Sequence, residues 1–360
     1  MAPKHPDAEA LSPTVIIGTG LIGASIGCAL TEAGVDVRLR DRYRSHAVVA
    51  AGVGAGSVEA PMATKVRLVV VAVPPAVVAP TVAQAIKHYR NATVTDVASV
   101  KQPILADLEA MGTDLRRYVG SHPMAGSELS GPLTARPRLF VDRTWVLAEG
   151  TGSAEAVETA EKLVGICGAR LVRRAPADHD RAVAETSHVP QIMSSLTAAR
   201  LADVPPEDLR LAGQGVRDVT RIANSDPALW RQIISGNRAE ISTQLKAIRD
   251  DLDRLIAGLD DIKTIGELIA RGRSGVAALP GKHGRPASTT LEHVTVEIPD
   301  APGALARLFV DIMGQGVNVE DLSIEHGYDR DVGYLSITVE AEQAQDLREA
   351  MGEKGWTLRS

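Results

Sequence analysis

Residues 14–23, TVIIGTGLIG, join a short β-branched run to three glycines in the spacing G-x-G-x-x-G. A helical pattern follows, with Ile22, Ile26 and Leu30 on one face, and a second alternating run ends at Asp41. Strand, glycines, helix, strand and acid in this order are typical of a dinucleotide-binding βαβ unit. The pattern therefore predicts a Rossmann-type α/β fold in the N-terminal part of the chain.

In such a unit the three glycines have separate tasks. The first permits a tight turn, the second lets the backbone approach a pyrophosphate, and the third lets the helix pack closely on the strand. The N-terminus of the helix then faces the phosphates. The residues expected to bind the cofactor at this loop are Gly18, Gly20, Leu21, Ile22 and Gly23.

Asp41 indicates which dinucleotide is bound. Its carboxylate can accept the ribose hydroxyls and would repel a 2′-phosphate, which favours NAD. Arg40 and Arg42 flank it, however, so NADP remains an alternative cofactor.

The α/β pattern continues to residue 173. Residues 66–73 are an apolar run typical of a strand buried on both faces, and residues 93–97 form the next strand. Both strands lead to the sheet edge where a cofactor would lie. The residues predicted at that edge are Val73, Pro74, Ser99 and Lys101, the last two being equally suited to capping a helix. With later strands at 144–147 and 170–172, residues 1–173 are predicted to form a doubly wound sheet of six or more strands.

The composition excludes several classes of protein. A net charge of −6 with interspersed signs argues against a nucleic-acid binder. The two cysteines, Cys28 and Cys167, lie in apolar patterns and fit a reducing compartment rather than a disulfide scaffold. Neither a secretory signal nor a bilayer-spanning run is visible, so we expect a soluble cytoplasmic protein.

From residue 174 to residue 272 the pattern is helical throughout. The expected helices span 178–202 with a break near Pro190, 208–223, and about thirty residues from 225 or 226 onward. A helix of the last length buries too little against a single sheet domain. Such a helix would bury more of its apolar surface in a helix bundle between subunits, which predicts a homodimer.

The C-terminal part is set apart by a change of composition. Residues 273–290 are rich in Gly, Arg, Pro and Ser without periodicity, which is typical of a linker. Residues 291–360 then give strand, helix, strand, strand, helix and strand, with strands expected at 317–325 and 356–358 among them. This order predicts a ferredoxin-like βαββαβ domain, in which the turn at 300–303 exposes backbone groups at a helix start.

The side chains suited to proton transfer gather in residues 119–131, VGSHPMAGSELSG. His122 stands there at the end of a short strand, and an imidazole with a pKa of about 6.5 can accept a proton at physiological pH. In the helical part, Arg217, Asp218 and Arg221 lie close together, and an arginine commonly holds an acid substrate through a bidentate pair. These features predict a dehydrogenase that acts on an anionic alcohol.

A metal site is not expected. His179 and His188 are nine residues apart, which places them about half a turn out of phase on an α-helix, so they cannot share one face. Each can instead be a structural histidine, His179 more readily than His188.

The sequence resembles the prephenate dehydrogenases, a family that includes the arogenate and cyclohexadienyl dehydrogenases of tyrosine biosynthesis. Besides the glycine loop, the shared motifs are DVASVK at 96–101, SHPMAGSE at 121–128, TSHVP at 186–190, RDVTRIA at 217–223 and DPALW at 226–230. The resemblance covers nearly the whole chain. The C-terminal module resembles an ACT domain, a small-molecule regulatory fold.

This resemblance implies NAD-dependent oxidative decarboxylation of prephenate to 4-hydroxyphenylpyruvate. His122 matches the histidine that draws the proton from the ring 4-hydroxyl while hydride passes from the same carbon to NAD⁺. Ser99 matches a serine near that hydroxyl and the nicotinamide, and Arg221 matches the arginine that binds a substrate carboxylate. The other residues implied at the substrate site are Ser121, Glu128, His188, Gln191, Asp218 and Trp230. In the ACT-like module, Asp300, Gly303 and Asn318 fall where the family contacts an amino-acid effector.

Gln191 departs from the family pattern. A second histidine in the motif His-x-Pro-His is often found at this position, and glutamine cannot supply an imidazolium to the substrate. This leaves room for arogenate, which bears an ammonium where prephenate has a keto group. There are two competing interpretations. One is a hydroxyacid-type reductase, which would have a helical catalytic lysine and no ACT module. The other is a non-catalytic sensor that binds NAD and an amino acid.

Overall fold

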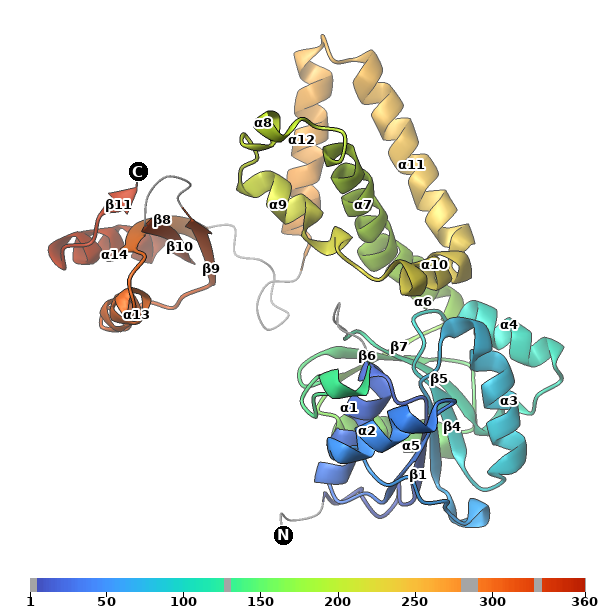
Figure 1. Ribbon diagram of the computed structural model, residues 1–360. Coiled ribbons are helices and arrows are strands. Elements are labelled where there is room, and N and C mark those ends of the chain that lie inside the picture. Colours follow the sequence, from blue (N-terminus) through green and yellow to red (C-terminus); the bar gives the residue numbers. More distant parts are fainter. Residues whose placement is uncertain (1–4, 126–130, 280–290, 327–331, 360) are drawn as a thin grey trace. The chain divides into compact units, whose positions relative to one another are not determined.

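The computed structural model describes residues 5–125, 131–279, 291–326 and 332–359 (Figure 1). The chain divides into two units, Met1–Arg249 and Asp250–Ser360. Among the described residues, no helix is both long and apolar enough to cross a lipid bilayer.

Seven strands form the sheet of the first unit, in the order β2-β1-β3-β4-β5-β6-β7. Their bounds are β1 Thr14–Ile17, β2 Val37–Arg40, β3 Leu68–Val71, β4 Thr93–Asp96, β5 Tyr118–Pro123, β6 Thr144–Ala148 and β7 Arg170–Arg174. Neighbouring strands are parallel except β5 and β6, which pair antiparallel. The predicted Rossmann-type sheet is confirmed, with one antiparallel pair that the sequence pattern did not indicate.

Helices cover both faces of this sheet. Leu68 and Val70 of β3 pack in one core with α1 Leu21–Glu32, α2 Arg44–Gly52 and α5 Ala154–Ile166. Val69 and Val71 pack in the other core with α3 Val78–His88 and α4 Gln102–Ala110. The whole of β3 is buried because alternate side chains enter opposite cores, which explains its continuous apolar run.

Helices follow the last strand of the sheet. Their bounds are α6 Pro176–Val183, the π-helical turn η5 Ala184–His188, α7 Val189–Leu201, α8 Pro206–Leu209, α9 Gln214–Thr220, the 3₁₀ turn η6 Arg221–Ala223, α10 Pro227–Gly236, α11 Arg238–Ala257 and α12 Ile262–Ala277. These elements are shorter than the sequence pattern predicted.

Each departure from the predicted helices has a local cause. The backbone of the first helix stays helical but widens at η5, next to Pro190. The second predicted helix divides at Gly213, which precedes α9. The third divides into α10 and α11 at Asn237, whose side chain bonds elsewhere in the fold. Finally, α12 extends into the predicted linker, of which residues 280–290 lie outside the described residues.

The second unit contains an antiparallel sheet of four strands, in the order β11-β8-β10-β9. Its elements are β8 Leu291–Pro299, α13 Ala304–Met313, β9 Asp321–His326, β10 Val332–Glu340, α14 Ala341–Glu353 and β11 Leu358–Arg359. Apolar residues of both helices and of the sheet, Leu308, Leu347 and Leu335 among them, form a core of its own. The last strand begins later than expected because Trp356 packs against this core and donates its indole N–H to Asp311 at 2.9 Å.

Candidate active site

The loop between β1 and α1 has the shape of a phosphate cradle. Gly18 has a φ of +95°, and a Cβ atom there would lie 2.2 Å from the carbonyl oxygen of Ala72. A Cβ atom at Gly23 would lie 2.0 Å from the oxygen of Gly18, so only glycine lets α1 come this close to β1. At Gly20 an added Cβ atom would meet nothing within 4 Å, which leaves open space at the start of the helix.

The start of α1 supplies the electrostatic part of this cradle. No side chain caps the helix at Gly20, and its first turn holds no acidic residue. Uncapped N–H groups at Leu21 and Ile22, together with the helix dipole, favour an anion such as a pyrophosphate. Asp41, at the end of β2, hydrogen-bonds to the same loop. The residues present therefore fit a dinucleotide.

His122, near the end of β5, contacts a histidine of the helical region. Its Nδ1 lies 2.9 Å from Nε2 of His179 in α6. Nδ1 of His179 lies in turn 2.7 Å from Oδ1 of Asp180. His179 and Asp180 are buried, whereas His122 keeps part of its surface exposed. The three side chains form a continuous hydrogen-bonded series that ends at the partly buried ring of His122.

With His179 neutral, these contacts assign the atom of His122 that can accept a proton. The carboxylate of Asp180 can only accept, so Nδ1 of His179 donates to it. In a neutral His179 ring Nε2 is then an acceptor, and Nδ1 of His122 donates to it. The lone pair of His122 therefore lies on Nε2, which arranges the ring as a general base.

The surroundings also keep His122 uncharged. Desolvation lowers the pKa of His122 well below its ordinary value of 6.5, and the nearby ammonium of Lys101 lowers it further. Burial lowers the pKa of His188 to about 4. Both rings are therefore neutral at physiological pH, as a proton acceptor must be.

Asp180 joins the helical region to the loop after β4. Its carboxylate accepts the backbone N–H groups of Lys101 at 2.8 Å and Gln102 at 2.9 Å. The side-chain amide of Asn237 donates to the backbone oxygen of Asp180 at 2.7 Å and lies 3.1 Å from Nδ1 of His188. We call this group of five residues the histidine cluster: His122, His179, Asp180, His188 and Asn237.

The π turn explains how two histidines of one helical stretch reach the same cluster. An α-helix would place His179 and His188 about half a turn apart. In η5 the N–H of Val189 bonds to the carbonyl of Ala184, five residues earlier, and the wider turn changes the phase of α7 relative to α6. Pro190, which follows, has no N–H with which to restore α-helical bonding. The expectation that helical spacing separates the two histidines is therefore corrected: Asn237 links His188 to the backbone of Asp180, next to His179. Within the described ranges, no group of three or more His, Cys, Asp or Glu side chains is arranged to hold a metal ion.

Three members of the histidine cluster were not predicted as site residues: His179, Asp180 and Asn237. The first two form a His-Asp pair in the first helix after the last strand of the sheet, and that position was the available signal. Asn237 gave none, because it lies inside a stretch with the apolar spacing of one long helix.

Two predicted site residues, Lys101 and Ser121, are turned into the interior. Lys101 is 2% exposed; its ammonium contacts the carboxylate of Asp96 and donates to the backbone oxygen of Ser121 at 2.7 Å. The hydroxyl of Ser121 donates to the backbone oxygen of Asp96 at 2.7 Å, and Tyr118 donates to the Asp96 carboxylate, also at 2.7 Å. These contacts hold β4 and β5 together beneath His122. They favour a structural role for both side chains.

The other predicted substrate residues differ in burial and in their contacts with the cluster. Trp230 meets His188 edge-on, with ring centroids 6.1 Å apart. Gln191 is 6% exposed. Arg221 and Asp218 are exposed, and in the described part of the chain no hydrogen bond or ion pair joins Arg221 to the histidine cluster.

The remaining predicted positions are less constrained by contacts. Ser99 and Val73 are partly buried, and Pro74 is exposed, beyond the ends of β4 and β3. Glu128 lies outside the described residues. In the second unit, the predicted effector positions Asp300, Gly303 and Asn318 are all exposed.

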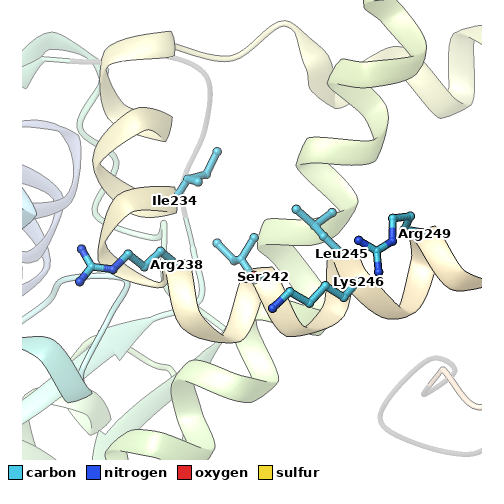
Figure 2. Close-up of a pocket in the computed structure, with 7 residues that line it drawn as sticks. Ile234, Arg238, Ser242, Leu245, Lys246 and Arg249 are labelled. Atoms are coloured by element: carbon cyan, nitrogen blue, oxygen red, sulfur yellow. The ribbon is translucent and has the colours of Figure 1, made fainter.

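The helical region also holds a surface pocket of about 330 Å³ on α10 and α11 (Figure 2). Ile234, Ile241 and Leu245 give it an apolar lining, and Arg238 and Lys246 are among the cationic residues beside them. The pocket has no residue in common with the histidine cluster. It is therefore a surface feature separate from the histidine cluster.

Comparison with known proteins gives the family of the chain. The nucleotide-binding domain of prephenate dehydrogenase matches residues 26–173, and the dimerization domain of the same enzyme matches residues 175–268. The probable prephenate dehydrogenase NovF of Streptomyces niveus is 38% identical over 96% of this chain and 99% of its own length. This chain belongs to the prephenate dehydrogenase family.

Other prephenate dehydrogenase relatives are more distant. The enzyme of Bacillus subtilis is 26% identical over 72% of this chain and 72% of its own length. The crystal structure of Synechocystis arogenate dehydrogenase is 26% identical, with a TM-score of 0.63 over 73% of this chain and 98% of that chain. Both family domains end before residue 269, so they do not include the antiparallel sheet of the second unit.

Proposed function

We propose that this chain catalyses the oxidative decarboxylation of prephenate to 4-hydroxyphenylpyruvate, with NAD⁺ as the oxidant. The main support is the hydrogen-bonded series His122–His179–Asp180. It leaves Nε2 of His122 as the proton acceptor, beside the carboxyl end of the sheet. The loop from Gly18 to Gly23 and Asp41 would hold the dinucleotide at the same end of the strands.

The residues of the cluster account for the proton in this reaction. When bound, NAD⁺ accepts the hydride from the ring carbon that bears the 4-hydroxyl group. Nε2 of His122 takes the proton of that hydroxyl, while Nδ1 keeps its bond to His179. The ring carboxylate leaves as CO₂, and its bonding electrons complete the aromatic ring. The resulting phenolate oxygen then takes back a proton.

Family motifs supply the proposed substrate contacts. Arg221 would pair with a substrate carboxylate, and Ser99 would lie near the reacting hydroxyl. The remaining positions proposed around the substrate are Glu128, His188, Gln191, Asp218 and Trp230.

Steady-state turnover of prephenate and of arogenate, each with NAD⁺ and with NADP⁺, tests this function. We expect prephenate to give NADH, CO₂ and 4-hydroxyphenylpyruvate in equal amounts. Failure of both substrates with both nucleotides, in a protein that still binds NADH, would overturn the proposal and favour the non-catalytic sensor.

Gln191 supports arogenate dehydrogenase as a second candidate. Its Oε1 lies 3.4 Å from the hydroxyl of Ser225, and its Nε2 lies 3.5 Å from the hydroxyl of Ser195. The Gln191 amide thus has neutral hydroxyl neighbours and brings no positive charge to the proposed substrate site. A substrate side chain that carries its own ammonium is compatible with such surroundings.

Gln191→His is expected to raise the ratio of kcat/KM for prephenate over arogenate about three- to tenfold, because an imidazole adds a hydrogen-bond donor that can become charged. Gln84→His, the same change at an exposed position of α3, provides the matched control. Competition between the two substrates in one assay measures the ratio directly. An unchanged ratio would remove Gln191 as a specificity determinant.

We propose a homodimer, and the apolar residues that a single chain leaves exposed support it. Ile256 of α11 is 67% exposed and Ile269 of α12 is 60% exposed. We expect light scattering to give the mass of two chains, and Ile256→Asp to shift the protein toward monomer. Asp253→Asn, at an exposed position of the same helix, should leave the mass unchanged. A monomeric wild-type protein would contradict the assignment.

We also propose that residues 1–173 bind the nucleotide, that 174–272 complete the substrate site and the dimer, and that residues 291–360 form an ACT-like regulatory domain. Support for the last is the order of its elements and the exposed turn before α13, where Gly303 has a φ of +88°. Asp300 and Asn318 are the polar residues proposed to contact an aromatic amino acid.

Deletion of residues 291–360 tests the regulatory proposal. Tyrosine is expected to inhibit the full chain and to have no effect on the truncated enzyme, because the effector site would be gone. Initial rates with and without tyrosine, at several prephenate concentrations, give the result. Inhibition that persists after truncation would instead indicate competition at the active site.

A further inference from the structure

Thr19 connects the phosphate cradle to Asp41. It is the second residue of the glycine loop, and its side chain is fully buried. Its backbone N–H and its hydroxyl both donate to Oδ2 of Asp41, each at 2.8 Å. The backbone N–H of Tyr43 donates to the other oxygen, Oδ1, at 2.9 Å. The carboxylate is therefore held from two sides.

The number of these bonds fixes which oxygen remains for a ligand. A carboxylate offers about four acceptor positions, two on each oxygen. Thr19 occupies both positions on Oδ2, and Tyr43 occupies one on Oδ1. The ring of His46 approaches Oδ1 only to 3.8 Å, which is beyond hydrogen-bond distance. Oδ1 is thus the oxygen that can accept a ribose hydroxyl.

The orientation of Asp41 matters because arginines lie next to it in sequence. Arg42 and Arg44 are exposed, and the guanidinium of Arg42 lies 5.7 Å from the centre of the Tyr43 ring. A carboxylate free to rotate could pair with one of these guanidinium groups. Such a pair would neutralise the charge that repels a 2′-phosphate. The hydrogen bond from the Thr19 hydroxyl adds to the one from its backbone N–H. It holds the Asp41 carboxylate against the glycine loop and opposes this rotation.

We propose that the hydroxyl of Thr19 is a positioning group for nucleotide specificity: it holds Asp41 so that the site prefers NAD⁺ to NADP⁺. The inference rests on the proposed function for the identity of the cofactor. It goes beyond the fingerprint motif, in which the residue between the first two glycines is unrestricted.

The test compares Thr19→Val, which keeps the shape and removes the hydroxyl, with Thr19→Ser, which keeps the hydroxyl. Affinities for NADH and NADPH are measured by fluorescence titration of the purified full chain, which requires no turnover. For Thr19→Val we expect the preference for NADH over NADPH to fall about tenfold, the size of one hydrogen bond to a charged group. Thr19→Ser should stay within about twofold of the wild type. The ratio of kcat/KM for NAD⁺ and NADP⁺ should change in parallel.

Three results would overturn the proposal. An unchanged preference in Thr19→Val would show that the hydroxyl does not position Asp41. An equal loss of affinity for both nucleotides would indicate damage to the loop, and loss of preference in Thr19→Ser would assign the effect to the methyl group. If Thr19→Val does not fold, Thr19→Ala replaces it with the same expectation. A chain that binds NADH with the expected preferences but oxidises neither prephenate nor arogenate would contradict the proposed function and leave this inference standing.

Discussion

The His122→Asn variant is expected to lose about 10²–10⁴-fold in kcat at neutral pH, with little change in the KM for NAD⁺. Asparagine can donate to His179 but has no basic nitrogen to take the proton of the substrate hydroxyl. Because desolvation lowers the pKa of His122 well below 6.5, the wild-type ring is neutral from that pH upward. Its kcat/KM should therefore be flat between pH 6.5 and 8 and fall only at lower pH, as the ring gains a proton.

The matched control for this prediction is His88→Asn, the same chemical change at an exposed position at the end of α3. It should keep the wild-type rate and pH profile. Prephenate turnover at saturating NAD⁺, measured from pH 5 to 9, compares both variants with the wild type. A His122→Asn enzyme within about threefold of the wild-type kcat would remove His122 as the base.

The nucleotide loop was predictable from sequence because its function depends on residues that are neighbours along the chain. Gly18 and Gly23 are required by a local turn and by one helix–strand contact, and the distances found there match those tasks. The apolar run around β3 likewise indicates a strand that is buried on both faces, because each of its side chains must itself be apolar to lie in a core. Such local features can be recognised in the sequence without knowledge of the tertiary contacts.

The histidine cluster depends on features that a periodic pattern does not contain. α-Helical spacing throughout predicts opposite faces for His179 and His188, and one π turn changes that spacing. The position of Lys101 after a strand predicts a cofactor contact, yet its ammonium contacts Asp96 in the interior. Asn237 lies where apolar spacing predicts an unbroken helix, and the break depends on tertiary bonds to Asp180 and His188.

Substitution of His179 should show that His122 and His179 act as a unit. His179→Asn is expected to lower kcat about 10–10²-fold with smaller effects on both KM values, because His122 loses the partner that fixes its tautomer and orientation. The variant His122→Asn/His179→Asn should be nearly as active as His122→Asn alone, since a positioning residue has no effect once the base is absent.

Asp180→Asn extends this argument to stability. The change leaves a poorer acceptor for His179 and for the backbone N–H groups of Lys101 and Gln102, which should lower the free energy of unfolding by about 1–3 kcal/mol. His179→Asn removes only one of these donors and should be less destabilised. Denaturant unfolding separates this loss from the kinetic one. If His179→Asn kept full kcat while Asp180→Asn lost only stability, the buried pair would serve the fold alone, and His122 would work without a positioning partner.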